Sequence, residues 1–171
     1  ITTTGFSTVD FDVWPTFSKV ILAALMFTGA CAGSTGGGFK VTRLVILFKS
    51  IKQELKRMIH PRSVRAIKFE GKVVDQTTLN GVGIYLGIYM MCLVAVIIAI
   101  SFEPFDFETS FSAALSCFNN IGPGFSAVGP MASDAEYTGF SKLILSFAML
   151  LGRLEIYPLL IALTPSTWTK K

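Results

Sequence analysis

The sequence predicts an all-α polytopic membrane protein built from helix–re-entrant loop–helix repeats, and three observations support this class. Of the 171 residues, 51% are hydrophobic and only 15% are charged, whereas soluble domains have about 25% charged residues. The charges are clustered, so residues 76–102 form an uncharged run long enough to span a bilayer, which needs about 20 residues. A stretch near the N-terminus also recurs, in the same order, in the second half of the sequence. These features argue against a soluble enzyme.

The first expected helix, Phe17–Thr28, is apolar but is followed by a glycine-rich stretch, residues 29–38. The helical pattern resumes at Val41 and continues to Lys56, becoming more basic. Because glycine weakens a helix, we expect a helix that enters the membrane, is interrupted, and then continues. The three cysteines all lie in apolar stretches without CxxC spacing, which predicts embedded small side chains rather than a disulfide framework or a metal site.

The second half of the chain predicts a spanning helix over 79–102, then a short helix over 108–118. The short helix must end near Gly122-Pro123-Gly124, since a proline between two glycines disfavours helix. At about 16 Å it cannot cross the membrane, so the segment should enter and return on the same side. A last apolar helix is expected over 140–164, interrupted only by isolated charges.

The charge distribution predicts the orientation. Eight Lys or Arg residues lie between Lys49 and Lys72, whereas residues 9–16, 102–108 and 126–139 contain acidic residues and no basic ones. The positive-inside rule places the basic segment in the cytoplasm and the acidic segments outside. The basic segment is therefore interpreted as a topology-determining surface, with anionic lipid or a cytosolic partner as the alternative, and nucleic acid binding is not expected.

An internal repeat relates the two halves. Residues 17–22 (FSKVIL) recur as residues 140–145 (FSKLIL), a shift of 123 positions, and residues 5–9 (GFSTV) resemble residues 124–128 (GFSAV). Both copies run in the same direction, so their symmetry axis lies along the membrane normal. Units arranged around such an axis can enclose a pore.

The uncharged loops of the two copies have the chemistry of a cation site. Irregular backbone occurs at membrane depth only where it is buried in protein or lines water. Glycine permits torsions that turn successive carbonyls to one side, and carbonyl oxygens can replace the hydration shell of a cation. The C-terminal end of the short helix also favours a cation. Two glycine loops at matching points of a membrane repeat therefore predict a cation pathway.

These motifs resemble a known family. Residues 2–8 (TTTGFST) resemble the third filter loop of the Trk/Ktr/HKT superfamily of potassium transporters, and residues 29–41 (GACAGSTGGGFKV) resemble its intramembrane loop. Residues 119–125 (NNIGPGF) resemble the fourth filter, and Gly152-Arg153 is similar to the arginine site in the last helix. The bacterial TrkH/TrkG branch is the most similar. The resemblance implies a fold of pore-loop repeats related to potassium channels.

The family has four repeats, and the chain begins without a methionine at a filter loop. The resemblance implies that residues 1–58 end the third repeat, 59–77 form a basic cytoplasmic linker, and 78–171 form the fourth repeat. Gly5 and Gly122 are then the filter glycines, although the GFS match leaves Gly124 as the alternative partner of Gly5. The potassium-binding carbonyls implied by the resemblance are those of Thr3, Thr4, Asn120 and Ile121.

The glycine-rich loop and Arg153 are expected to obstruct the pore below the filter. The gating residues implied are Gly33, Gly36, Gly37, Gly38 and Arg153. Arg153 lies about 15 Å inside its helix, where an unpaired charge costs about 3 kcal/mol, so it needs a partner. The repeat register aligns Arg153 with Ala30, so it can donate to loop carbonyls, and structural anchoring is the alternative. Glu155 is a poor partner because residues two apart point to different sides of a helix.

The function implied by the resemblance is potassium uptake across a bacterial inner membrane, through a carbonyl-lined selectivity filter with an intramembrane gating loop, without enzymatic activity or a cofactor. Its implied partners are the lipid bilayer, a second copy in a homodimer, and cytosolic nucleotide-binding RCK-type regulatory subunits. Two alternatives remain: a non-conducting membrane scaffold or regulatory subunit of the same fold, and a secondary transporter of an organic solute. The loops offer mainly backbone carbonyls, which fit a cation better than an organic solute.

Overall fold

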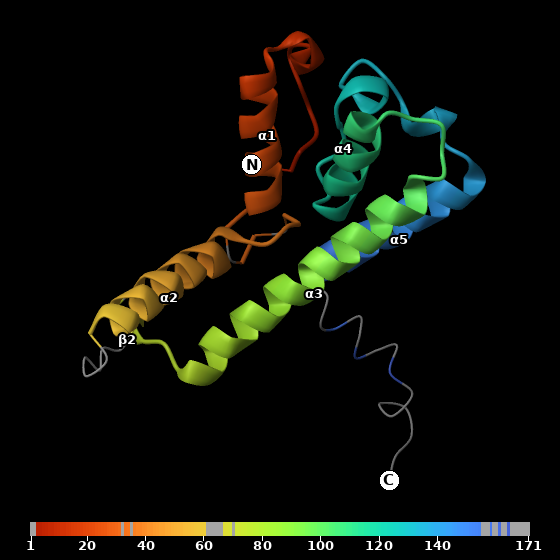
Figure 1. Cartoon of the computed structure of the whole chain (residues 1–171). Coiled ribbons are helices and arrows are strands. Elements are labelled where there is room, and N and C mark those ends of the chain that lie inside the picture. The colour runs from red at the N-terminus through yellow and green to blue at the C-terminus, as the bar shows by residue number, and fades with distance from the viewer. Residues whose placement is uncertain are drawn as a thin grey trace.

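The computed structural model describes residues 3–31, 33–34, 36–60, 67–69, 71–154, 158, 161 and 164. Five α-helices account for most of these residues: α1 Thr16–Thr28, α2 Val41–Ile59, α3 Gln76–Ile100, α4 Phe107–Phe118 and α5 Gly139–Arg153. Three single 3₁₀ turns, Phe11–Val13, Ser126–Val128 and Asp134–Glu136, lie in the connecting loops. In Figure 1, α1 stands beside α4, and α3 runs from the far end of α2 to α4, with α5 along its C-terminal half.

Helix α3 is the spanning helix that the sequence predicts. Among the described residues it is the one helix long and apolar enough to cross a membrane. It begins three residues earlier than expected because the Asp75 side chain accepts a hydrogen bond from the Gln76 amide (2.9 Å), which caps the helix. Its 25 residues extend about 37 Å.

The interruption between α1 and α2 is confirmed. Helix α1 ends at Thr28, and Gly29 follows with a φ of +65°, a conformation that glycine adopts without strain. Helix α2 begins at Val41, whose amide donates to the Ala30 carbonyl at 3.2 Å. The loop between the helices therefore returns close to the point where it left α1.

Helix α4 is the short helix expected before the Gly-Pro-Gly segment. Its 12 residues end at Phe118, and the side chains from Ala113 to Phe118 are all buried. It packs against α3, α5 and α1. A helix of this length extends about 18 Å and cannot span the bilayer, so its position inside the other helices is what allows an irregular loop to follow it.

The expected linker contains a small antiparallel hairpin, so the fold is mostly helical rather than all-α. Strand β1 (Lys68–Phe69) pairs with β2 (Lys72–Val73), and the turn uses Gly71 at a φ of +80°. The Lys49 ammonium donates to the Lys68 carbonyl (2.9 Å) and lies 5.6 Å from the Phe69 ring centre. These contacts attach the hairpin to α2. The sequence did not predict the hairpin, because strands of two residues show no recognisable pattern.

An aromatic cluster packs α3 against the interrupted helix and α4. Tyr89 and Phe39 are almost fully buried, and their ring centres lie 6.0 Å apart. Tyr89 also contacts Phe27 at 5.4 Å and Phe118 at 4.9 Å, both edge to face. Such pairs contribute about 0.5–1.5 kcal/mol each beyond their buried area. The cluster joins the first copy of the repeat to the second.

The C-terminal end of α3 and the N-terminal end of α5 are joined by Glu103. Its carboxylate accepts hydrogen bonds from the hydroxyls of Thr138 and Ser141 and from the Thr138 amide. The two hydroxyl hydrogen bonds hold the pKa of Glu103 below its usual value of 4.5.

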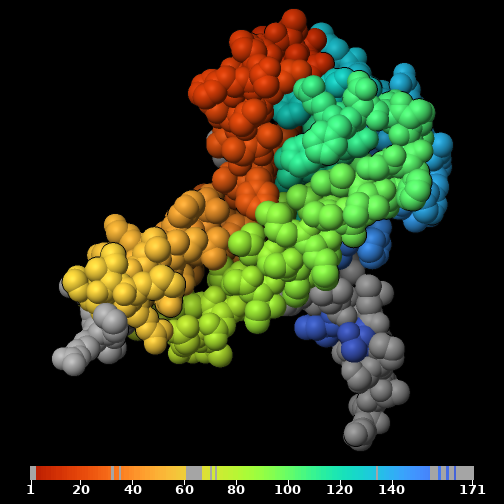
Figure 2. All heavy atoms as spheres, in the orientation of Figure 1, coloured from red at the N-terminus to blue at the C-terminus, as the bar shows by residue number. Residues whose placement is uncertain are grey.

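Helix α5 ends at Arg153 and a bend follows at Leu154, a break within the helix that the sequence predicts over 140–164, although the described residues 158 and 161 are again helical. The remaining residues of that prediction lie mostly outside the described residues. Figure 2 shows the N-terminal residues, coloured red, packed against the teal residues that follow α4. The two loop regions of the repeat therefore meet in space.

Candidate functional site

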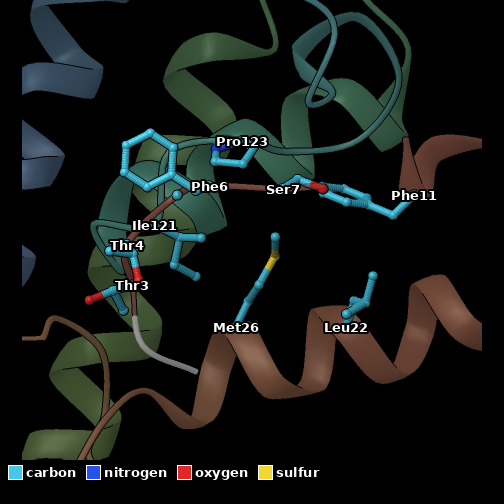
Figure 3. Close-up of a pocket in the computed structure, with 10 residues that line it drawn as sticks. Thr3, Thr4, Phe6, Ser7, Phe11, Leu22, Met26, Ile121 and Pro123 are labelled. Carbon is cyan, nitrogen blue, oxygen red and sulfur yellow. The ribbon is translucent and has the colours of Figure 1, made fainter. Parts of the chain in front are cut away.

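The two predicted filter loops lie side by side. A Cβ placed on Gly5 would lie 2.6 Å from the Ile121 carbonyl oxygen, and one on Gly122 would lie 3.7 Å from the Gly5 Cα. A cavity of about 220 Å³ separates the loops from α1, whose Met26 projects into it beside Ile121 and whose Leu22 lines it on the side of Phe11 (Figure 3). The carbonyl oxygen of Ile121 thus lies close to the backbone of the other loop.

The two loops share an alternating backbone conformation. In the first, Thr3 and Gly5 have φ angles of +54° and +77°; in the second, Asn120 and Gly122 have +55° and +112°. The residue between each pair has a negative φ. A positive φ is uncommon outside glycine, so its occurrence at matching places in both loops is informative. Alternation of this kind lets successive carbonyls point to one side of the chain.

Gly122, and not Gly124, is the structural counterpart of Gly5. Gly122 shares the positive φ and lies next to Gly5, whereas Gly124 has no positive φ and packs on α4. A Cβ on Gly124 would lie 2.9 Å from the Ser112 hydroxyl and 2.6 Å from a Val128 methyl. The geometry therefore agrees with the pairing of Gly122 with Gly5, which the resemblance implies, and not with the alternative pairing of Gly124 with Gly5.

Helix α4 holds the second loop through two serine hydroxyls that sequence reasoning did not single out. The Ser116 hydroxyl donates to the Gly122 carbonyl (2.7 Å) and accepts from the Gly122 amide (3.1 Å). The Ser112 hydroxyl accepts from the Phe125 amide at 2.9 Å. The carbonyl of Gly122 is therefore directed at α4. The four-residue spacing, which places both serines on one face of the helix, is the signal in the sequence.

The asparagines that begin the second loop anchor it to three helices. The fully buried Asn119 accepts from the Tyr89 hydroxyl (2.7 Å) and donates to the Leu115 carbonyl (2.9 Å). Asn120 donates to the Met149 carbonyl of α5 at 3.0 Å. Burial of a polar side chain is favourable only when it is hydrogen-bonded, so these contacts restrict Asn119 to one position.

The glycine-rich loop contacts the base of both filter loops. A Cβ on Gly36 would lie 3.2 Å from the Thr3 hydroxyl, and one on Gly37 would lie 2.5 Å from the Asn119 carbonyl oxygen. A Cβ on Gly38, whose φ is +91°, would lie 3.0 Å from the Asn119 amide oxygen. Only glycine fits this close approach of backbone to backbone. Gly33, in contrast, is exposed, with nothing among the described residues within 4 Å of its Cβ position.

Arg153 is the last residue of α5 and is exposed. Its neighbour Gly152 lies against the end of α4, since a Cβ there would be 1.7 Å from the Phe118 carbonyl oxygen and 3.2 Å from the Asn120 amide nitrogen. Arg153 thus directly follows a residue that lies against the base of the second loop. Its hydrogen bonds to the glycine-rich loop stay a prediction, and Glu155 lies outside the described residues.

The architecture is a mostly helical fold in which two glycine-containing loops lie side by side and against the glycine-rich stretch that joins α1 to α2. The TrkH family profile, described as cation transport protein, matches residues 1–170. The chain therefore belongs to the TrkH family of cation transport proteins.

Its relatives are potassium uptake proteins of bacteria. The chain is 40% identical over 167 residues to the Trk system potassium uptake protein TrkH of Vibrio parahaemolyticus and 36% identical over 168 residues to TrkG of Escherichia coli K12. Both matches cover 98% of this chain and 34% of the relative. The crystal structure of the potassium transporter TrkH from Vibrio parahaemolyticus matches with a TM-score of 0.87 at 39% identity, over 98% of this chain and 36% of that one. The chain thus spans about a third of the length of these relatives.

Proposed function

We propose that this chain forms part of a potassium uptake pathway across the bacterial inner membrane, in which the carbonyls of the paired loops select the ion. One observation supports this most strongly: Thr3 and Gly5 in one loop share their positive φ angles with Asn120 and Gly122 in the other, and the loops are adjacent. The carbonyls of Thr3, Thr4, Asn120 and Ile121 are the proposed ligands. Carbonyl oxygens suit a weakly held monovalent cation, because they replace water without adding a full charge.

The glycine-rich loop is the proposed gate. Its residues Gly36, Gly37 and Gly38 lie directly against Thr3 and Asn119. A loop without side chains can approach this closely and can also leave without breaking side-chain packing. Arg153 and Gly33 belong to the proposed gate by resemblance. In the assembled transporter we infer a homodimer with cytosolic nucleotide-binding subunits of the RCK type.

The filter proposal is tested by substituting serine for each filter glycine in the protein as its gene encodes it. Gly5→Ser introduces a Cβ 2.6 Å from the Ile121 carbonyl at a positive φ, whereas Gly122→Ser adds only the strain of its φ of +112°. Both variants should discriminate less well between potassium and sodium, Gly5→Ser the more strongly. Gly139→Ser is the matched control, because nothing among the described residues lies within 4 Å of its Cβ position.

The assay measures rubidium uptake, with sodium as competitor, in bacterial cells lacking their own potassium uptake systems, normalised to transporter in the membrane. Wild-type protein that fails to support growth at low potassium would favour the scaffold alternative. Uptake with unchanged sodium competition in both filter variants would remove the filter assignment. Wild-type uptake of an organic solute instead of rubidium would favour the secondary transporter.

A further inference from the structure

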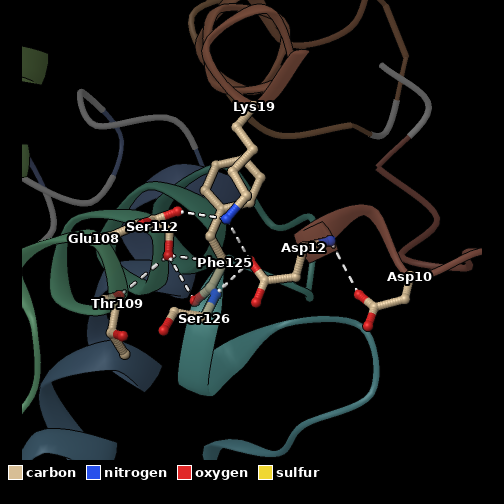
Figure 4. Close-up of polar contacts among 8 residues, drawn as sticks. All are labelled: Asp10, Asp12, Lys19, Glu108, Thr109, Ser112, Phe125 and Ser126. Carbon is tan, nitrogen blue, oxygen red and sulfur yellow. Dashed lines mark hydrogen bonds and ion pairs between the residues drawn. The ribbon is translucent and has the colours of Figure 1, made fainter. Parts of the chain in front are cut away.

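Three charged side chains form a bridge at the outer end of α1 (Figure 4). The Lys19 ammonium lies 2.9 Å from an Asp12 carboxylate oxygen and 2.9 Å from a Glu108 carboxylate oxygen. Lys19 is in the second turn of α1, Asp12 follows the first filter loop, and Glu108 is in the first turn of α4. One lysine therefore links the first copy of the repeat to the short helix of the second copy.

Asp12 extends the bridge to the second filter loop. The oxygen that contacts Lys19 also accepts a hydrogen bond from the Ser126 amide at 2.9 Å. Next to it, Phe11 and Phe125 pack edge to face with ring centres 5.8 Å apart. The hydrogen bond from Lys19, and then that from the Ser126 amide, lower the pKa of Asp12, so its carboxylate is charged at neutral pH.

Both ends of the bridge are continuous with the second filter loop. Ser126 lies four residues after Gly122, and Glu108 belongs to α4, whose Ser116 holds Gly122 by two hydrogen bonds. Asp12 lies in the segment that continues from Gly5. The bridge thus connects the outer side of one filter loop to both supports of the other.

We propose that Lys19 is a positioning residue that sets the separation of the two filter loops and thereby the preference for potassium over sodium. This inference rests on the proposed function of the loops. Ion selection by carbonyls depends on their placement, so a change in loop separation alters selectivity even when the protein remains folded. Lys19 acts through Asp12 and Glu108 and does not itself contact the ion.

The second copy of the repeat provides a matched control. Lys142 lies 123 positions after Lys19, and its ammonium donates to the carbonyl of Ala135, 123 positions after Asp12, at 2.8 Å. This lysine therefore contacts the outer loop of its own copy, as Lys19 does. Its contact is a hydrogen bond to backbone, whereas Lys19 forms two ion pairs that reach the other copy. Removing either lysine changes the net charge of the outer surface equally.

The experiment compares Lys19→Gln, Lys19→Arg, Glu108→Gln and Lys142→Gln in the protein as its gene encodes it. Rubidium uptake is measured against increasing sodium, together with the amount of transporter in the membrane. We expect Lys19→Gln to lower the ratio of rubidium affinity to sodium affinity about three- to fivefold, because that factor corresponds to the free energy that partly exposed ion pairs contribute. Lys19→Arg should restore most of the ratio, and Lys142→Gln should leave it unchanged. The Lys19→Gln Glu108→Gln double variant should lose little more than either single variant.

Three results would overturn the inference. The first is an equal loss of selectivity in Lys142→Gln, which would assign the effect to outer-surface charge. The second is a lower apparent KM for rubidium in Lys19→Gln at an unchanged ratio, which would mean that the lysine only weakens cation attraction. The third is a loss of transporter from the membrane with normal selectivity per molecule. If the filter variants Gly5→Ser and Gly122→Ser and the Lys19 variants all leave selectivity unchanged, the filter proposal is wrong. If only the Lys19 variants leave selectivity unchanged, the proposed role of Lys19 is wrong and the filter proposal stands.

Discussion

Replacement of Gly152 by alanine tests the contact on which the position of the second filter loop depends. The added Cβ would lie 1.7 Å from the Phe118 carbonyl oxygen and 2.8 Å from its carbon. Real Cβ atoms essentially never approach within 3.0 Å, so α5 and the end of α4 must separate by more than about 1 Å. Phe118 is fully buried and cannot yield without moving the residues that follow it.

The expected cost is that of overpacking a close helix contact, about 1–3 kcal/mol. For a chain of this size each kcal/mol lowers the melting temperature by about 2–4 °C, so Gly152→Ala should melt about 2–12 °C below the wild type. The separation should also strain the hydrogen bond from Asn120 to the Met149 carbonyl, which is 3.0 Å in the structure. Selectivity for potassium should therefore fall together with stability.

The measurement is thermal unfolding of the detergent-solubilised protein, followed by the loss of the monodisperse peak in size-exclusion chromatography. Gly87→Ala is the control, because Gly87 is also inside a helix but has nothing within 4 Å of its Cβ position among the described residues. That variant should be neutral or more stable, since alanine favours helix by about 0.5–1 kcal/mol over glycine. A Gly152→Ala midpoint within about 1 °C of the wild type would refute the close packing of α5 on α4.

Further predictions concern the supports of the filter, the gate and the outer surface. Tyr89→Phe removes the hydroxyl that donates to buried Asn119 and should cost about 1–3 kcal/mol, measured as a lower melting temperature with unchanged helix content by circular dichroism. Arg153→Ala and deletion of residues 36–38 should each raise the flux per transporter. If both act on one obstruction, combining them should raise the flux little further. Lower expression of Arg153→Ala without higher flux would indicate that Arg153 is a structural anchor. Since the pKa of Glu103 is lowered on folding, its stabilisation is present above about pH 4.5 and is lost as the pH falls through the folded-state pKa. Glu103→Gln should therefore be less stable than the wild type at pH 7, and the melting curves of the two should converge as the pH falls through the folded-state pKa of Glu103; a constant difference would contradict this linkage.

Local features of the sequence were sufficient to predict most of the helices and the glycine-rich and Gly-Pro-Gly segments at which they end. The uncharged run that forms α3, the glycines after Thr28, and Pro123 between two glycines act through hydropathy and backbone torsion, which depend on neighbouring residues alone. The internal repeat similarly indicated that two loops occupy equivalent places. The hairpin at Lys68–Val73 was missed because strands of two residues have no detectable period.

Contacts between distant residues were decided only by the tertiary structure. The choice of Gly122 over Gly124 depends on which glycine lies against Gly5, and a sequence that offers both cannot make that choice. The Lys19–Asp12–Glu108 bridge joins residues up to 96 positions apart, and nothing in their local sequence marks them as partners. A charge pattern reports net charge and topology, whereas an ion pair requires that folding bring two particular atoms within about 4 Å.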